Sequence, residues 1–292
     1  SQKGLSLFNQ SQEKIFLLDN IRFFEGEKIN DLRFSRSITD HLDLYINEAF
    51  STSHRNHASV NQMAKNIQSL PGFNFEKEII AINEIKKSSK RKLAIIGGSK
   101  VSTKINTLLS LTKSCSNIFI GGAMANNFLK FKDIPVGDSL LEDGSEKMIE
   151  EIYDNAKKFS CEIHLPLDVV TDRVEKYLIN KIPLDLNFKI LDLSDNSINL
   201  LDNLISKSEI VLWNGPMGMI ENKKFAYGSS KLASLLANSS SQVVIGGGDT
   251  LLAINIAGIN FDQFYFVSTA GGAFLEALED KQLPGIEALN LN

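Results

Sequence analysis

The sequence predicts an α/β fold in which parallel sheets are doubly wound, with helices on both faces. Short apolar runs that stop at a glycine occur at 92–100 (KLAIIGGSK), 117–124 (NIFIGGAM), 210–218 (IVLWNGPMG) and 243–252 (VVIGGGDTLL). Such runs are typical of strands buried on both faces of a parallel sheet. Apolar residues at helical spacing follow most of these glycines. The alternation of strand, glycine turn and helix indicates right-handed βαβ units.

Length and composition fit a globular protein of about two domains. The chain has 292 residues, of which 43% are hydrophobic and 23% are charged. The net charge of −4 gives no general attraction for nucleic acid or an anionic membrane, so any anion site must be local. No apolar run approaches the ~20 residues that span a bilayer. Cys115 and Cys161 fit no metal or redox spacing, which favours a reduced, cytoplasmic chain.

The amino-terminal part predicts a different order of elements. The expected elements are strands at 14–24 (KIFLLDNIRFF) and 43–50 (DLYINEAF), an amphipathic helix within 54–70 that Pro71 ends, and a helix over about 76–87. We therefore expect a domain boundary near residues 70–76, with the second of these helices beginning the larger domain.

The glycine turns define a candidate site. In open α/β sheets, ligands bind outside the carboxyl ends of the strands. Glycine turns there present bare backbone N–H groups, which suit phosphate. One such turn is most simply a tight strand-to-helix connection, whereas four on one edge indicate a nucleotide or phosphate site. Neither G-x-x-x-x-G-K-[ST] nor G-x-G-x-x-G follows a predicted strand, which weakens both the P-loop and the ordinary dinucleotide interpretations.

Two lysines and an aspartate follow these turns. Lys100 and Lys104 are four apart at a predicted helix start, so they are expected to share one helix face, as a phosphate grip or as a pair of surface lysines. Asp249 comes after three glycines, where it fits either a helix N-cap or a ligand of phosphate-bound Mg²⁺. Thr250 adds a hydroxyl to the same loop.

Arginines mark the amino-terminal part. Arg22 and Arg55 lie beside predicted strand ends, and His54 and His57 flank Arg55. An arginine fork matches phosphate or carboxylate. An ordinary salt bridge is an equally good interpretation for Arg22, whereas the histidine-rich segment favours anion binding.

Motifs distributed along the whole chain resemble those of the phosphoglycerate kinase family. They are, in the family's order, LLDNIRFFEGEKIND, YINEAFSTSHRNHAS, PGFNFEKEI, GGSKVSTKI, GGAMANNFL, VGDSLLE, LPLDVV, WNGPMGMIE, GGGDT, VSTAGGAFLEAL and LPGIEAL. The resemblance spans Lys14 to Leu289, and so many strings in one order are specific.

The resemblance implies two domains across a hinged cleft. Residues 1–72 would be the remaining part of the 3-phosphoglycerate-binding domain, residues 73–272 would bind Mg²⁺ and ATP or ADP, and residues 273–292 would return to the first domain. The implied enzyme is a monomeric phosphotransferase that moves a phosphoryl group between 1,3-bisphosphoglycerate and ADP, with a carboxyl group as acceptor in the reverse direction. Positioning and charge neutralisation dominate such chemistry.

The resemblance also assigns roles to residues. Arg22 and Arg55 would bind the triose acid, Lys104 the nucleotide phosphates, and Lys100 the phosphoryl group in transfer. Glu221 would bond the ribose. The remaining assignments are Gly247, Gly248, Asp249 and Thr250 as the phosphate loop, with Asp249 at the metal, and Gly271 and Gly272 as amide donors to the moving charge.

Departures from the family pattern leave alternatives. Family members carry a further half-domain before the first of these motifs, including a catalytic arginine and an H-x-x-R segment, and we expect the amino-terminal domain of this chain to be incomplete. Ser194, Asp195 and Ala270 replace family residues in nucleotide-side loops, and Ser51 replaces a glycine. The alternatives are a nucleotide-binding remnant without kinase activity, or, from the sheet pattern alone, a dehydrogenase that binds NAD.

Overall fold

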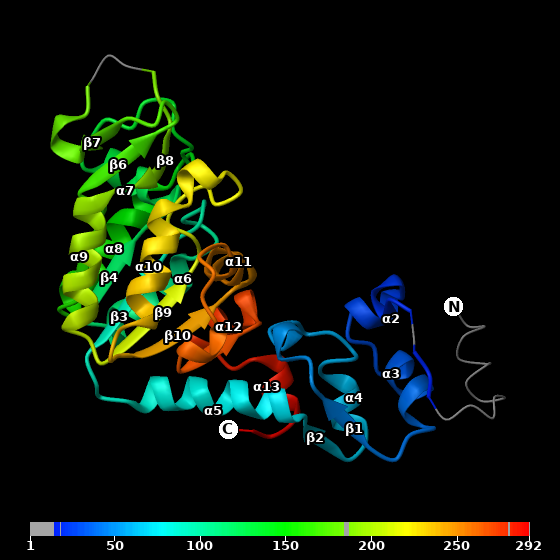
Figure 1. The fold of residues 1–292 in the computed structure, drawn as a ribbon. Helices are drawn as coiled ribbons and strands as arrows, with labels where there is room; N and C mark the ends of the chain where they lie inside the picture. Colours follow the sequence, from blue (N-terminus) through cyan, green and yellow to red (C-terminus); the bar gives the residue numbers. More distant parts are fainter. Residues whose placement is uncertain (1–14, 18, 184–186, 280, 292) are drawn as a thin grey trace. The chain divides into compact units, whose positions relative to one another are not determined.

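The computed structural model describes residues 15–17, 19–183, 187–279 and 281–291, and it divides the chain into two compact units (Figure 1). The smaller unit comprises residues 1–80 and 281–292, and the larger unit comprises residues 81–280. The division falls within helix α5 (Phe73–Lys87). The sequence analysis places the domain limits after residues 72 and 272 and assigns a substrate to each segment. Those limits and assignments stay a prediction.

A six-stranded parallel sheet forms the centre of the larger unit, in the order β11-β10-β9-β3-β4-β5. Its strands are β3 (Lys92–Ile96), β4 (Asn117–Ile120), β5 (Glu162–His164), β9 (Ile210–Asn214), β10 (Gln242–Gly246) and β11 (Phe266–Ser268). The four glycine-terminated strands predicted from the sequence are confirmed. From β3 the chain winds toward β5, and from β9 it winds toward β11. The pair β3 and β9 is therefore the topological switch point.

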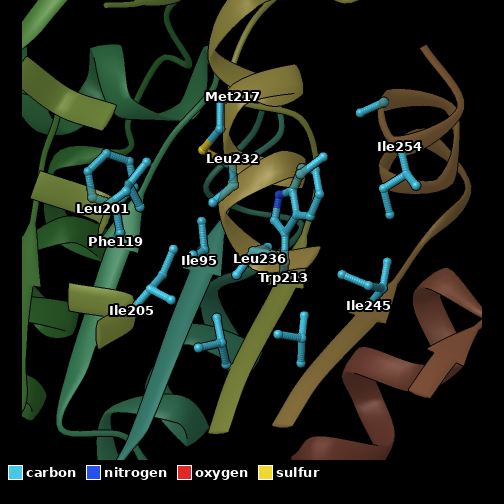
Figure 2. Close-up of a cluster of buried hydrophobic side chains, with 14 of the residues drawn as sticks. Ile95, Phe119, Leu201, Ile205, Trp213, Met217, Leu232, Leu236, Ile245 and Ile254 are labelled. Carbon is cyan, nitrogen blue, oxygen red and sulfur yellow. The ribbon is translucent and has the colours of Figure 1, made fainter. Parts of the chain in front are cut away.

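Helices cover both faces of this sheet (Figure 1). They are α6 (Ile105–Ser114), α7 (Met124–Phe131), α8 (Glu146–Lys158), α9 (Asp195–Ser206), α10 (Tyr227–Ala237), α11 (Gly248–Ile256) and α12 (Gly271–Leu278), with 3₁₀ turns η4 (Lys223–Phe225) and η5 (Phe261–Gln263). The main core lies between the sheet and helices α9, α10 and α11. Trp213 of β9 is fully buried at its centre (Figure 2). It is a core residue, as the sequence predicts.

A three-stranded antiparallel sheet, β7-β6-β8, forms a second, smaller sheet at one end of the larger unit (Figure 1). Its strands are β6 (Asp168–Thr171), β7 (Lys176–Leu178) and β8 (Ile190–Leu193), and a 3₁₀ turn, η3 (Ile179–Lys181), follows β7. Asp168 and Asp192 are buried in this sheet and accept hydrogen bonds from the first residues of α9 and α10. These two carboxylates join the small sheet to the helices of the main core.

The smaller unit contains short elements. They are η1 (Ile21–Phe23), α2 (Glu25–Lys28), α3 (Leu32–Thr39), β1 (Tyr45–Asn47), η2 (Phe50–Thr52), α4 (Gln62–Asn66), β2 (Ser69–Pro71) and α13 (Pro284–Ala288). Strands β1 and β2 pair in parallel. The carboxyl-terminal segment belongs to this unit, where the Gly285 amide donates to the Ser53 carbonyl (2.9 Å).

Two expectations for the smaller unit are wrong. The strand predicted at 14–24 is absent from its described residues, because the Asn20 side chain accepts from the Arg22 amide (3.0 Å) and turns the chain into η1. The helix predicted within 54–70 shrinks to α4. The Ser69 hydroxyl bonds the Ala64 carbonyl (2.6 Å), and the chain then enters β2 beside β1. Tertiary pairing overrides helical periodicity in this segment.

In the part of the chain that the structure describes, no helix combines the length and the apolar character that crossing a membrane requires.

Candidate functional site

The carboxyl ends of the parallel strands meet at one edge of the sheet, and the glycine turns follow there. At the switch point, the Gly97 amide donates to the Asn214 carbonyl (2.8 Å). A side chain at Gly97 would place its Cβ 2.1 Å from the Pro216 carbonyl oxygen. Only glycine allows the turns after β3 and β9 to approach this closely.

The neighbouring turns continue this edge. The Met124 amide, at the start of α7 just after the turn that follows β4, donates to the Gly98 carbonyl (2.8 Å). On the other side, Gly247 has a φ of +99° after β10, and its Cα lies 3.3 Å from the position that a Cβ on Gly271 would take. The turns after β10 and β11 are therefore adjacent. Helices α11 and α12 begin here, at Gly248 and Gly271, so that their amide ends lie at the same edge.

Lys104 reaches back to the switch point. Its ammonium group donates to the Gly97 carbonyl (2.5 Å) and to Asn214 Oδ1 (2.7 Å). Burial lowers the pKa of Lys104 to about 8, and the carboxylate of Asp249 opposes this shift. Among the described residues, no carboxylate lies within ion-pair distance of Lys104, so the part-buried charge rests on neutral oxygens. Such a charge gains stability when an anion arrives.

Asn214 and Thr250 hold this edge together. The Asn214 amide nitrogen donates to the Gly246 carbonyl (2.6 Å) while its oxygen accepts from Lys104. The buried Thr250 hydroxyl accepts from the Gly215 amide (2.7 Å) and donates to the Gly246 carbonyl (2.8 Å). The Thr250 hydroxyl is therefore engaged within the protein. Sequence reasoning missed Asn214, although its place at a strand end before Gly215 was a signal.

Two details of the lysine and aspartate predictions are wrong. Helix α6 begins at Ile105, after a turn, so Lys100 and Lys104 do not share a helix face. Lys100 is exposed, whereas Lys104 is part-buried. The N-cap of α11 is Gly247, and Asp249 lies in the first turn. Asp249 is exposed and keeps its carboxylate available.

The donor set fits Mg²⁺ bound to a nucleotide. Among the described residues, no group of three or more His, Cys, Asp or Glu side chains could hold a metal by itself. Mg²⁺ is usually held by one or two carboxylates together with substrate phosphates and water. Asp249, exposed at the glycine edge, is the carboxylate that would hold it, and the ion would neutralise phosphate charge.

A pocket of about 450 Å³ opens beside these turns in the larger unit. Its walls come from the glycine turns, from α7 and from the small antiparallel sheet. The residues that contribute most of its apolar wall are Ala125, Leu129, Leu140, Val169, Leu191, Leu193, Pro216, Met217 and Met219. Gly98, Asp249 and Glu221 also line it. An apolar hollow next to a phosphate-suited edge matches a nucleoside joined to its phosphates.

Asp192 supports one wall of the pocket. Its carboxylate accepts from the amides of Gly228 (3.1 Å) and Leu193 (2.9 Å). Burial raises the pKa of Asp192 to about 7, and the amides of Gly228, Leu193 and Tyr227 oppose the rise. A Cβ on Gly218 would lie 2.4 Å from Asp192 Oδ1, so this glycine makes room for the carboxylate. Sequence reasoning missed Asp192.

Ser194, Asp195 and Ala270, which depart from the family pattern, neither line the pocket nor strain the backbone. Ser194 and Asp195 lie outside the lining of the pocket, which ends at Leu193 in this segment. The hydroxyl of Tyr227 and the ammonium of Lys176 donate to Asp195 and lower its pKa to about 2. Ala270 has a φ of −102°, which alanine adopts without strain.

The smaller unit places Arg22 in η1 and Arg55 in the turn after η2, and both residues are exposed. The buried carboxylate of Glu27 accepts from the Ser59 amide (2.8 Å) and hydroxyl (2.6 Å). His57 Nδ1 lies 3.7 Å from Glu27 Oε1. Glu27 thus shapes the histidine-rich segment beside Arg55.

Glycine turns, a part-buried lysine and an apolar pocket at a topological switch point are the features of α/β proteins that bind nucleotide phosphates. The sequence matches the family model described as phosphoglycerate kinase over residues 5–281. The chain belongs to the phosphoglycerate kinase family.

Individual relatives agree. The chain is 37% identical to phosphoglycerate kinase from Wolbachia sp. subsp. Drosophila simulans (strain wRi), covering 99% of this chain and 74% of the relative. It is 40% identical to that of Prochlorococcus marinus (strain MIT 9312), covering 96% and 72%. The fold matches the structure of phosphoglycerate kinase from Coxiella burnetii with a TM-score of 0.85 and 32% identity, covering 93% of this chain and 71% of that one.

Family membership gives the reaction class. Phosphoglycerate kinases are phosphotransferases (EC 2.7.2.3) that act in glycolysis. They move a phosphoryl group reversibly between 1,3-bisphosphoglycerate and ADP, giving 3-phosphoglycerate and ATP, with Mg²⁺.

Proposed function

We propose that the larger unit of this chain binds Mg²⁺ with ATP or ADP at the glycine edge, the edge of the six-stranded sheet where the glycine turns follow the strands. We further propose that the chain transfers a phosphoryl group reversibly between 1,3-bisphosphoglycerate and ADP. The observation that carries this proposal is the ammonium group of Lys104. It is part-buried, it sits where two glycine turns meet, and its partners are the neutral oxygens of Gly97 and Asn214. A polyphosphate supplies the charge that this environment lacks.

The phosphates are bound from several sides in this proposal. Lys104 binds the nucleotide phosphates, and the exposed Lys100 neutralises the phosphoryl group in transfer. Gly247 and Gly248 let backbone approach the phosphates, and a Cβ on Gly248 would meet open space. Asp249 holds Mg²⁺. Thr250 acts by fixing the turn after β9, since its hydroxyl is already engaged.

The remaining charge stabilisation comes from the start of α12, where Gly271 and Gly272 present amide groups. Glu221 lines the pocket and is exposed, so its carboxylate is available to the ribose hydroxyls.

In the smaller unit, Arg22 and Arg55 bind the phosphate and carboxylate groups of 3-phosphoglycerate or 1,3-bisphosphoglycerate. We assign residues 1–72 to triose binding, residues 73–272 to nucleotide binding and residues 273–292 to the return segment. The protein acts as a cytoplasmic monomer without a nucleic-acid or membrane partner, consistent with its net charge of −4.

Calorimetric titration with Mg-ADP tests the nucleotide site. Wild-type chain is expected to bind, and Lys104→Ala is expected to weaken binding at least about tenfold, the scale of one lost charge-assisted contact. Lys113→Ala, in the last turn of α6, serves as the matched control. Equal losses in the two variants, or tighter binding of NAD than of Mg-ADP, would exclude the site. A coupled assay of ATP formation from 1,3-bisphosphoglycerate tests catalysis separately.

A further inference from the structure

The carboxylate of Glu142 holds the turn that carries the two proposed phosphate lysines. The Ser102 amide donates to Glu142 Oε2 (3.1 Å), and the Ser102 hydroxyl donates to Oε1. We propose that Glu142 is a positioning residue for nucleotide binding, which fixes the turn from Lys100 to Lys104 and thereby the grip on the phosphates. This inference rests on the nucleotide site proposed above.

The turn from Lys100 to Lys104 combines local hydrogen bonds with the contact from Glu142. It follows Gly97 and Gly98 and ends at Lys104, the N-cap residue of α6, whose side chain caps no amide. Local hydrogen bonds from the Lys104 amide to the Val101 carbonyl (2.9 Å) and from the Thr103 hydroxyl to the Lys100 carbonyl (3.0 Å) close it on itself. Ser102 lies in this turn before the helix begins, and Glu142 supplies the acceptor for its amide and hydroxyl from another part of the chain.

The segment around Glu142 is itself anchored to α7. The Glu142 amide donates to Asn127 Oδ1 (2.8 Å), and the Ser145 hydroxyl donates to the same oxygen (3.3 Å). The neighbouring Asn126 donates to the Leu140 carbonyl (3.3 Å). Both asparagines are buried. Glu142 therefore extends from a fixed base, as a positioning residue must.

The same segment lines the nucleotide pocket. Leu140 forms part of its apolar wall, and Asp138 lies at its border. Residues 138–145 thus reach the apolar wall of the pocket through Leu140 and the turn before α6 through Glu142. A nucleoside held at the wall and a phosphate held at the turn are positioned by one loop, so their binding energies should be coupled.

The negative charge of Glu142 distinguishes a positioning role from simple repulsion of the nucleotide phosphates, because the two predict opposite effects on affinity. Burial raises the pKa of Glu142, but hydrogen bonds from Ser102 and Val101 and the charge of Lys100 outweigh it, so that the pKa lies below the ordinary value. The carboxylate is therefore ionised at neutral pH. As a mere negative charge near a polyphosphate it would weaken binding, and its removal would tighten binding. As a positioning residue it has the opposite effect.

The test compares Mg-ADP with adenosine, which lacks phosphates, by calorimetry on the full chain. In Glu142→Ala we expect a loss of roughly three- to tenfold in Mg-ADP affinity, the scale of one or two exposed charge-assisted hydrogen bonds. Adenosine affinity should change less than twofold. Unchanged or tighter binding of Mg-ADP overturns the inference, as does an equal loss for both ligands. A wild-type chain that binds neither ligand contradicts the proposed function instead.

Further variants separate positioning from folding. Glu142→Gln keeps the shape and can still bond Ser102, so it should recover most of the affinity, and a loss as large as that of the alanine variant overturns the inference. Ser102→Ala should weaken Mg-ADP binding in the wild type but not in Glu142→Ala, and additive losses also overturn it. Glu150→Ala, an exposed carboxylate of α8, should bind like the wild type. Thermal melting identifies any unfolded variant.

Discussion

Lys104 combines a charge, partial burial and neutral partners at one position. Its two acceptors, the Gly97 carbonyl and Asn214 Oδ1, stabilise an ammonium group without neutralising it. Desolvation therefore dominates, and the pKa falls to about 8. A bound polyphosphate favours the protonated form and raises this pKa again. Protonation of Lys104 and nucleotide binding are consequently linked.

The linkage gives a pH dependence with a definite sign. Well below its pKa of about 8, Lys104 is already protonated in the free chain, and its contribution to binding is constant. Above pH 8, binding must take up a proton, so Mg-ADP affinity should fall with rising pH, by at most about tenfold per unit. Titration calorimetry from about pH 7.5 to about pH 9.5 spans this pKa. Measured in buffers of different ionisation enthalpy, it gives both the affinity and the number of protons taken up on binding.

Lys104→Arg is the matched control for that pH profile. Arginine stays protonated throughout this range, so the decline in affinity above pH 8 should disappear in the variant. A decline that is equally steep in Lys104→Arg would assign the effect to another group.

The candidate site could be predicted from the sequence where a residue stands next to its motif. Lys104 follows Gly97 and Gly98 closely, and Asp249 follows three glycines, so sequence alone located both. Asn214, Glu142 and Asp192 act through partners on distant segments, such as Ser102 for Glu142 and Gly228 for Asp192. No local pattern encodes those contacts. The sequence likewise could not predict that the Thr250 hydroxyl bonds within the protein. A hydroxyl beside a glycine loop suits a contact with phosphate equally well.

At the scale of elements, helix starts in the larger unit depend on acceptors from elsewhere. Helix α9 has Ser194 at its N-cap without a side-chain hydrogen bond. Asp168 of β6 instead accepts from the amides of Asn196 (2.9 Å) and Ser197 (2.9 Å), and from the Ser197 hydroxyl (2.6 Å). This buried carboxylate replaces the local cap and fastens the small sheet to α9.

Loss of that carboxylate should destabilise the larger unit. Asp168→Ala leaves the Asn196 and Ser197 amides without their acceptor, while the Ser197 hydroxyl keeps the backbone carbonyl of residue 168 (2.9 Å). We therefore expect a loss of about 2–3 kcal/mol in the free energy of unfolding. Urea unfolding followed by Trp213 fluorescence measures it, since Trp213 lies in the main core. Asp154→Ala, an exposed position of α8, should change stability by less than about 0.5 kcal/mol. Similar values for the two variants would contradict the capping role.

The glycine turn at the switch point is a second element-scale determinant. An alanine at Gly97 would place its Cβ 2.1 Å from a backbone oxygen, which a side-chain rearrangement cannot relieve. Gly97→Ala should therefore cost about 2 kcal/mol or more in unfolding free energy. At Gly248 a Cβ meets open space, and Gly248→Ala should leave stability within about 0.5 kcal/mol of the wild type. Chemical denaturation of both variants makes the comparison, and equal losses would refute it.

The predictability of elements follows their length and burial. Strands such as β3 and β9 are buried along their whole length, so an apolar run ending in glycine identified them. The smaller unit has three-residue strands and a five-residue helix, α4. Elements this short are determined by tertiary contacts such as the pairing of Tyr45 with Ser69, and a sequence pattern of period two or 3.6 has too few residues to identify them.

At the scale of the whole molecule, the two units bury apolar residues very differently. The larger unit has an extended core of sheet and helix residues around Trp213. In the smaller unit, large apolar side chains are exposed, including Phe23 (79%), Ile29 (64%), Ile46 (57%) and Leu70 (47%). Burial of apolar surface is the main stabilising contribution to folding. The smaller unit should therefore open more readily than the larger one.

Hydrogen exchange with and without Mg-ADP tests this difference together with the location of the site. Without ligand, amides of β1 and β2 should exchange faster than those of β3, β9 and β10. At a free concentration about 100 times Kd, a ligand that binds only the folded larger unit stabilises it by about 2.7 kcal/mol. Protection should then increase in β3, β9 and β10 and stay unchanged in β1 and β2. Adenosine, which lacks phosphates, should protect these strands less. Equal protection of both units by Mg-ADP would show that its binding energy is not confined to the larger unit and would contradict a site at the glycine edge alone.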